Sequence, residues 1–273
     1  MPVASLGSCE LRYEISGEGP DLVLIHELGG ALDSFDGLLP LLTPHFRVLR
    51  YDQRGAGGSS RKPAALSMED HAADLAGLVA MTGFGPRCLL AGAAAGAAIA
   101  VAYAARDEAL VDALALCAPA LSVRPERKAY LDRRARLARR DGMAAIAEAS
   151  LARSYPEALR TDRRAFEAYR ERFLANDPES YAMANAVLAG TRVAKCLPSL
   201  TMPCLVLAGR HDLLRPPAEV EATAGTIPDA RFTTIESGHL MPVQAAQAMA
   251  AQLVPFLTRH AGSHKPIAES AHV

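Results

Sequence analysis

The sequence predicts an α/β fold in which a mostly parallel sheet, flanked by helices, carries an inserted all-helical cap. Short apolar runs alternate with helical patterns over residues 1–120, disappear between residues 121 and 192, and resume over residues 193–260. Strands followed by helices favour a parallel sheet covered on both faces, and we expect a helical block between two parts of one sheet to be a cap. The tail, residues 261–273, is small and polar and is predicted to be disordered.

Short apolar runs predict the strands of the core. The predicted strands are residues 9–16, 21–27, 46–52, 87–92, 111–119, 202–212 and 230–237. Between them, residues 67–83 have a helical period, with Ser67 as the N-cap, Asp70 three residues later and Gly83 where the helix should end. Residues 241–260 predict a final amphipathic helix.

The inserted segment reads as helix after helix, with breaks at Pro156, at residues 176–178 and at Gly190. It carries 14 Arg and 1 Lys against 10 Asp and Glu, a net charge of about +5, whereas the rest of the chain is about −6. A cationic cap over a pocket would attract a small anionic substrate such as a carboxylate. The plainer interpretation is that most of these arginines lie on solvated helix faces.

Composition excludes several classes of partner. The net charge is −1 and the pI is about 6.7, so no chain-wide positive field would hold nucleic acid or an anionic membrane. The N-terminus lacks a charged and apolar leader, and no apolar run reaches the length of a membrane span, so a cytoplasmic location is expected. The 5 cysteines are scattered and odd in number, which favours reduced, packed thiols over disulfides or a zinc site.

Five motifs follow predicted strands in a fixed order. They are LIHELGG at 24–30, YDQRGAGGSS at 51–60, AGAAAGAA at 91–98, LAGRHD at 207–212 and SGHLMPV at 237–243. Through these motifs the chain resembles the α/β-hydrolase superfamily over residues 9–260, and it is similar to the enol-lactonase-like branch with a helical cap. The resemblance implies the α/β-hydrolase fold, and it implies that the protein carries out chemistry at a carbonyl group.

The third motif has the frame of a nucleophile elbow, G-x-S-x-G, with Ala94 where the serine would stand. The resemblance implies that Asp212 orients His239, and that His239 is the general base. It also implies an oxyanion hole formed by the backbone N–H groups of Leu28 and Ala95. Because the apex is alanine, no side chain at that position can attack a carbonyl or accept a proton.

The loop after the second predicted strand departs from the pattern of the superfamily. Many relatives have glycine directly after the histidine, whereas this chain reads His26-Glu27-Leu28. We expect His26 and Glu27 to contact the substrate, with Glu27 either a second acid or base, or else turned away and paired with an arginine.

Other polar residues are expected to have structural roles. Asp52 lies in a glycine-rich turn that lacks the lysine and spacing of a phosphate loop, so neither a cofactor nor a metal is implied. His71 is predicted to lie on the surface, and His211 to be only a neighbour of the acid. The cap aromatics Tyr130, Phe166, Tyr169, Phe173 and Tyr181 are candidates to line the pocket.

We expect an α/β-hydrolase-type enzyme that acts on a small carbonyl substrate: an ester, a lactone, or an activated acyl C–C or C–N bond, with a carboxylated substrate as one option. Ala94 would then reflect engineering or natural loss of a serine. Two alternatives stay open. A native alanine favours a serine-independent lyase, decarboxylase or retro-Claisen-type enzyme that uses the His239–Asp212 dyad. The other alternative is a non-catalytic ligand-binding protein on the same scaffold.

Overall fold

The computed structural model describes residues 1–60, 66–85 and 87–262. One sheet runs through the described chain, with strand order β1-β2-β4-β3-β5-β6-β7-β8. The strands are β1 (Val3–Ser5), β2 (Glu10–Ser16), β3 (Asp21–Ile25), β4 (Arg47–Tyr51), β5 (Cys88–Ala93), β6 (Val111–Cys117), β7 (Cys204–Gly209) and β8 (Ala230–Ile235). Pairing is parallel from β4 to β8 and antiparallel at β1 and β2. The mostly parallel sheet is confirmed; β1 was not predicted, because three residues are too few to show a pattern.

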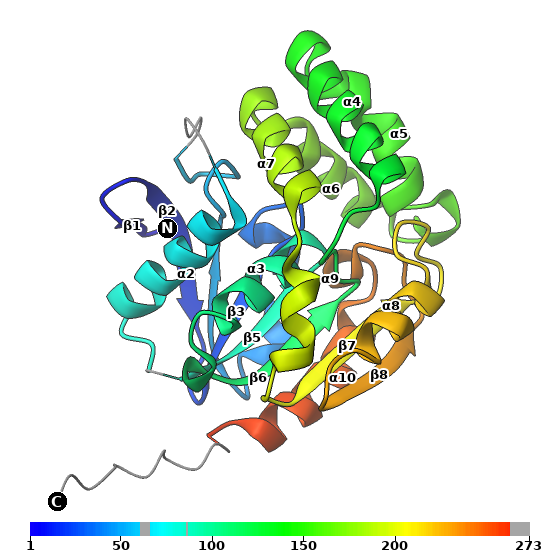
Figure 1. Ribbon diagram of the computed structural model, residues 1–273. Helices are drawn as coiled ribbons and strands as arrows, with labels where there is room; N and C mark the ends of the chain where they lie inside the picture. The colour runs from blue at the N-terminus through cyan, green and yellow to red at the C-terminus, as the bar shows by residue number, and fades with distance from the viewer. Residues whose placement is uncertain (61–65, 86, 263–273) are drawn as a thin grey trace, which may run out of the picture.

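Helices cover both faces of the sheet (Figure 1). The helices α2 (Met68–Met81), α3 (Ala95–Ala104) and α8 (Pro217–Ala224) pack on one face, and α1 (Leu39–Leu42) and α10 (Ala246–His260) pack on the other. The N-cap of α2 is as predicted, since the Ser67 hydroxyl accepts the Asp70 N–H at 3.1 Å. Short 3-10 turns complete the connections: η1 (Leu32–Phe35), η2 (Glu108–Leu110), η3 (Glu157–Leu159) and η4 (Val193–Ser199).

Four helices lie between β6 and β7 and gather beyond one end of the sheet (Figure 1). They are α4 (Pro125–Asp141), α5 (Ala144–Ser154), α6 (Arg163–Leu174) and α7 (Pro178–Gly190), and we call them the inserted helices. Breaks occur next to the residues where the sequence indicated them. A further break, which was not predicted, follows α4 at Gly142, whose φ of +81° is readily adopted by glycine.

Two predictions about the core helices were wrong. The helix predicted over residues 241–260 is interrupted at Ala245, whose φ of −151° and ψ of 47° are not helical and separate α9 (Met241–Gln244) from α10. His71 is buried, not on the surface, because it lies on the same face of α2 as Met68 and Leu75. The spacing of three and four residues between these side chains was the signal that could have placed His71 inside.

The 5 cysteines are free thiols, and only Cys196 is partly exposed. Of the predicted disordered tail, only Ala261 and Gly262, which form a turn, are among the described residues. None of the described helices has the length and apolarity needed to cross a membrane.

Candidate active site

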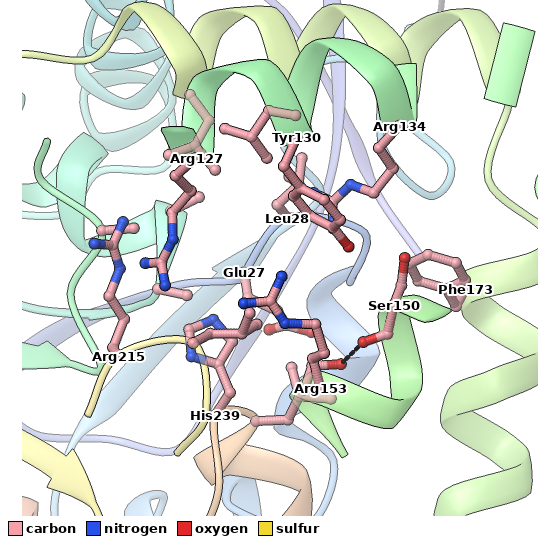
Figure 2. Close-up of a pocket in the computed structure, with 18 of the residues that line it drawn as sticks. Glu27, Leu28, Arg127, Tyr130, Arg134, Ser150, Arg153, Phe173, Arg215 and His239 are labelled. Atoms are coloured by element: carbon pink, nitrogen blue, oxygen red, sulfur yellow. Dashed lines mark hydrogen bonds between the residues drawn. The ribbon is translucent and has the colours of Figure 1, made fainter. Parts of the chain in front are cut away.

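Loops at the carboxyl ends of the parallel strands meet the inserted helices around one cavity (Figure 2). The loop after β3 contributes Glu27 and Leu28, the turn after β5 contributes Ala94 and Ala95, and the loop after β8 contributes His239. In open α/β sheets, ligands bind outside the carboxyl ends of the strands, so this is where a substrate site is expected.

The turn between β5 and α3 has the strained backbone of an elbow. Ala94 has φ +49° and ψ −108°, a conformation that L-residues rarely adopt. Two glycines make the turn possible: a Cβ on Gly96 would collide with the carbonyl oxygens of Ile25 and His26, and a Cβ on Gly92 would collide with the start of α3. The Ala94 methyl group is therefore held against the cavity at the N-terminus of α3.

Asp212 and His239 are brought together by the loops after β7 and β8. His239 Nδ1 lies 2.8 Å from Asp212 Oδ2, while Oδ1 of the same carboxylate accepts the backbone N–H groups of Leu214 and Arg215 at 2.7 and 2.9 Å. Burial alone would raise the pKa of Asp212, but the positive charge and hydrogen bond of His239, together with the backbone donors, lower it below its usual range. The pair thus has an ionised, fully hydrogen-bonded acid behind an imidazole that lines the cavity.

The two residues whose N–H groups are expected to form an oxyanion hole both lie at the cavity wall. Leu28 and Ala95 both line it, and in the described part of the chain neither backbone N–H has a hydrogen-bond acceptor. Ala95 is the first residue of α3, where N–H groups have no partner within the helix and the helix dipole favours negative charge.

His26 does not contact the cavity, which corrects the expectation that it binds substrate. Its Nδ1 lies 2.8 Å from the Glu27 carbonyl oxygen, and its Nε2 accepts the Gln53 N–H at 3.0 Å. Both ring nitrogens are therefore engaged with backbone groups, and the ring holds the loop that carries Leu28.

Glu27 does not have the second of its two expected arrangements. The side chain is only 2% exposed and lines the cavity, so it does not turn away, and no arginine among the described residues pairs with it. Its Oε1 accepts the Ser34 hydroxyl at 2.8 Å, whereas its Oε2 is buried without a hydrogen-bond partner in the described structure. Gly30 makes room for this carboxylate, because a Cβ there would collide with Oε1.

Arginines dominate the charge of the cavity wall. Arg127 and Arg134 extend from α4, Arg153 from α5, and Arg215 from the loop after β7 (Figure 2). Arg215 pairs with Glu219 at 2.7 Å, and Arg134 donates to the Asn185 side-chain oxygen. No carboxylate lies within ion-pair distance of Arg127 or Arg153 in the described structure.

The surroundings of Arg127 are unusual for an arginine. Burial, followed by the positive charges of Arg215 and Arg153, lowers the pKa of Arg127 despite the opposing effect of Glu219. An anion beside these arginines would relieve their mutual repulsion.

The aromatic residues of the inserted helices divide into two groups. Tyr130, Tyr169, Phe173 and Tyr181 line the cavity, while Phe166 packs away from it against Tyr155. Burial raises the pKa of Tyr169 well above its usual range, and the charge of the adjacent Glu27 carboxylate and a hydrogen bond to it add to this effect. Tyr169 is therefore a neutral phenol that lies within reach of the Glu27 carboxylate.

Asp52 and His211 lie outside the cavity wall and have structural contacts. Asp52 accepts the backbone N–H groups of Leu32 and Gly58, at 2.8 and 2.7 Å, which ties two loops together. His211 lies at the surface, 3.0 Å from Glu236. In the described part of the chain no group of three or more His, Cys, Asp or Glu side chains is arranged to hold a metal ion.

Ser34, which donates to Glu27, and Arg215 were not predicted from the sequence as parts of the site. A serine seven residues after a glutamate is not a recognisable sequence signal. Arg215 lies outside the positively charged inserted segment, residues 121–192. Only the folded loops bring these side chains to the cavity.

A family model described as the alpha/beta hydrolase fold matches residues 20–246. Among solved structures, the enol-lactonase from Burkholderia xenovorans LB400 is 31% identical with a TM-score of 0.88. The match covers 94% of this chain and 100% of the enol-lactonase chain. A thermophilic esterase from Thermogutta terrifontis is 32% identical, with a TM-score of 0.88 and coverage of 94% and 96%.

Two curated relatives match over nearly their whole length. A protein of Stutzerimonas stutzeri, provisionally named carbamate hydrolase RutD, is 28% identical over 92% of this chain and 98% of its own. The pyrrolizixenacetamide deacetylase of Xenorhabdus hominickii is 26% identical over 94% and 98%. With the sheet order and the family match, these likenesses show that the chain belongs to the α/β-hydrolase family, as a hydrolase.

Proposed function

We propose that the protein hydrolyses a small, anionic carbonyl compound with water activated directly by His239, without an acyl-enzyme. The observation that carries the proposal is the combination of a methyl group at the elbow apex with a fully hydrogen-bonded His239–Asp212 pair at the same cavity. Such a pair can remove a proton from water as readily as from a serine hydroxyl.

The proposed reaction has two steps. His239 takes a proton from a water molecule held beside Ala94, and the water oxygen attacks the carbonyl carbon of the substrate. The oxyanion that forms accepts hydrogen bonds from the N–H groups of Leu28 and Ala95. The intermediate then collapses, the bond to the leaving group breaks, and His239 returns the proton to the departing alcohol or amine.

The charge of the cavity supports an anionic substrate. Arg127 and Arg153 face the same cavity as His239 and are not neutralised by any carboxylate among the described residues. A carboxylate on the substrate would be held by these arginines while its carbonyl group lies at the oxyanion donors.

The relatives support chemistry at a carbonyl carbon, and their names divide between two kinds of bond. The carbamate hydrolase and the acetamide deacetylase are named for nitrogen-linked carbonyl compounds, whereas the esterase and the enol-lactonase are named for oxygen-linked ones. Hydrolysis of one of these two classes is therefore the function we propose for this chain.

Two probes test the proposal: monomethyl succinate, an anionic ester, and N-methylsuccinamate, which differs only in N–H for the ester oxygen. We expect the wild-type protein to hydrolyse at least one of them, and we expect His239→Ala to reduce kcat by about 1,000-fold or more. Wild type should not react with a serine-directed fluorophosphonate, whereas Ala94→Ser should be labelled. No turnover by wild type together with turnover by Ala94→Ser would overturn water attack in favour of a replaced serine. No turnover by either would favour the ligand-binding alternative.

A further inference from the structure

Among the described residues that line the cavity, Glu27 is the one acidic side chain, and the proposed reaction does not use it. We propose that its Oε2 accepts a hydrogen bond from an N–H group on the substrate carbonyl, so that the site selects amides or carbamates over esters. This inference rests on the proposed function, which it deepens by naming the substrate class.

The first support is the incomplete hydrogen bonding of the Glu27 carboxylate. Oε1 is satisfied by Ser34, whereas Oε2 makes no hydrogen bond of ordinary geometry in the described structure although the side chain is 98% buried. The neutral Tyr169 phenol beside the carboxylate is the nearby protein donor, and its approach does not satisfy Oε2. A buried acceptor without a donor costs free energy, and most buried polar atoms in proteins are paired. An N–H on the ligand would remove this cost when the site is filled.

The second support is that the fold specifically accommodates this side chain. Gly30 leaves space that a methyl group would take from the Glu27 carboxylate, and Ser34 fixes one of its oxygens. The carbonyl oxygen of Glu27 also accepts the Gly30 N–H at 3.1 Å, which closes the turn around the side chain. The unpartnered oxygen is thus held in place rather than free to turn toward solvent.

The third support is electrostatic. Glu27 directly precedes Leu28, one of the proposed oxyanion donors, and both residues line the cavity. A carboxylate near a developing oxyanion opposes it, by an amount that grows in a low-dielectric site. A polarised N–H between the two offsets this repulsion, because it donates to the carboxylate, whereas an ester oxygen presents only another acceptor.

The test compares the binding of the two probes, N-methylsuccinamate and monomethyl succinate, by isothermal titration calorimetry. All measurements use a His239→Ala background, so that neither probe is consumed. We expect Glu27→Ala to weaken the binding of N-methylsuccinamate by about 10- to 100-fold, the effect of losing a hydrogen bond to a charged group. The binding of monomethyl succinate should change by less than about threefold. Glu69→Ala, which removes an exposed glutamate from α2, is the matched control and should change neither value.

Three outcomes would overturn the inference: equal effects of Glu27→Ala on the two probes, no effect on either, or no binding of N-methylsuccinamate to the parent protein. Should Glu27→Ala fail to fold, Glu27→Gln keeps the shape of the side chain, and the same selective loss is expected in smaller degree. Failure of the proposed function looks different, because wild type would then hydrolyse neither probe while the binding preference for the N–H probe could still be measured.

Discussion

Two loops at the same edge of the sheet each present a buried carboxylate to the cavity region, and their surroundings differ. Asp212, in the loop after β7, receives hydrogen bonds on both oxygens from His239 and two backbone N–H groups. Glu27, in the loop after β3, receives one of ordinary geometry, from Ser34, and its Oε2 has only the Tyr169 phenol nearby. An acid with complete hydrogen bonding serves its protein partner, whereas an acid with an unpartnered oxygen is suited to a ligand.

The comparison predicts different consequences of removing each acid. Asp212 acts through His239, so its loss should affect every substrate. Glu27 is proposed to act on one group of the substrate, so its loss should affect only substrates that carry that group. The predictions that follow start from this difference and extend it to a buried histidine and to the cavity arginines.

Asp212→Asn should reduce kcat by about 1,000- to 10,000-fold for every substrate that the protein hydrolyses. The amide cannot stabilise the imidazolium that forms when His239 takes a proton, and it favours the wrong tautomer of the ring. Steady-state kinetics with both probes measure the effect. Asp229→Asn, at an exposed site, is the control and should keep full activity. Selective loss for one probe would contradict the assigned role of Asp212.

A buried histidine outside both loops extends the comparison to a basic group that burial keeps neutral. Burial lowers the pKa of His71 from 6.5 to about 4. Between pH 4 and pH 6.5 the unfolded chain therefore binds a proton at His71 that the folded chain does not bind. The stability associated with neutral His71 is fully present above pH 6.5 and is lost as the pH falls toward 4. Chemical denaturation should show a loss of up to about 3 kcal/mol over this range. His71→Asn should lack this component, and an unchanged pH profile in that variant would contradict the assignment.

The cavity arginines should matter for the anionic end of the substrate and not for its carbonyl group. Arg127→Ala should weaken the binding of monomethyl succinate by about tenfold, because a charge-assisted contact is lost in a partly buried site. The binding of uncharged methyl butyrate should stay the same. Arg164→Ala, on the exposed face of α6, is the control. Equal losses for the charged and uncharged esters would show that Arg127 shapes the wall and does not bind the anion.

The two acids should also differ in what they contribute to stability without ligand. Asp212→Asn should lower the free energy of unfolding by about 1–3 kcal/mol, since it disturbs a satisfied buried network. Glu27→Gln should leave it unchanged or raise it by up to about 1 kcal/mol, since it removes a charge whose hydrogen bonding is incomplete. A large loss of stability in Glu27→Gln would mean that the carboxylate is a structural group.

The sheet and its flanking helices could be predicted because their signals are local. Strand patterns such as residues 21–27 and the cap at Ser67 depend on neighbours within a few residues. The break at Ala245 could not be predicted, because alanine has a high helix propensity and does not mark the end of a helix.

The candidate site could be predicted in outline but not in detail. Chain order brought Ala94, Asp212 and His239 into one prediction, because a strand end fixes where each of them lies. The residues next to a loop side chain in the sequence do not determine the direction in which it points. For this reason His26 was expected at the cavity, where it does not lie, and the serine that holds Glu27 was not expected at all.

The most direct test of the difference between the two acids is how each variant changes the preference of the protein between the two probes. The kcat/KM for N-methylsuccinamate is divided by that for monomethyl succinate, and the quotient is compared among wild type, Glu27→Ala and Asp212→Asn. We predict that the quotient falls by about tenfold or more in Glu27→Ala and stays within about threefold of wild type in Asp212→Asn, although both rates fall there. A quotient that is unchanged in Glu27→Ala would contradict the account.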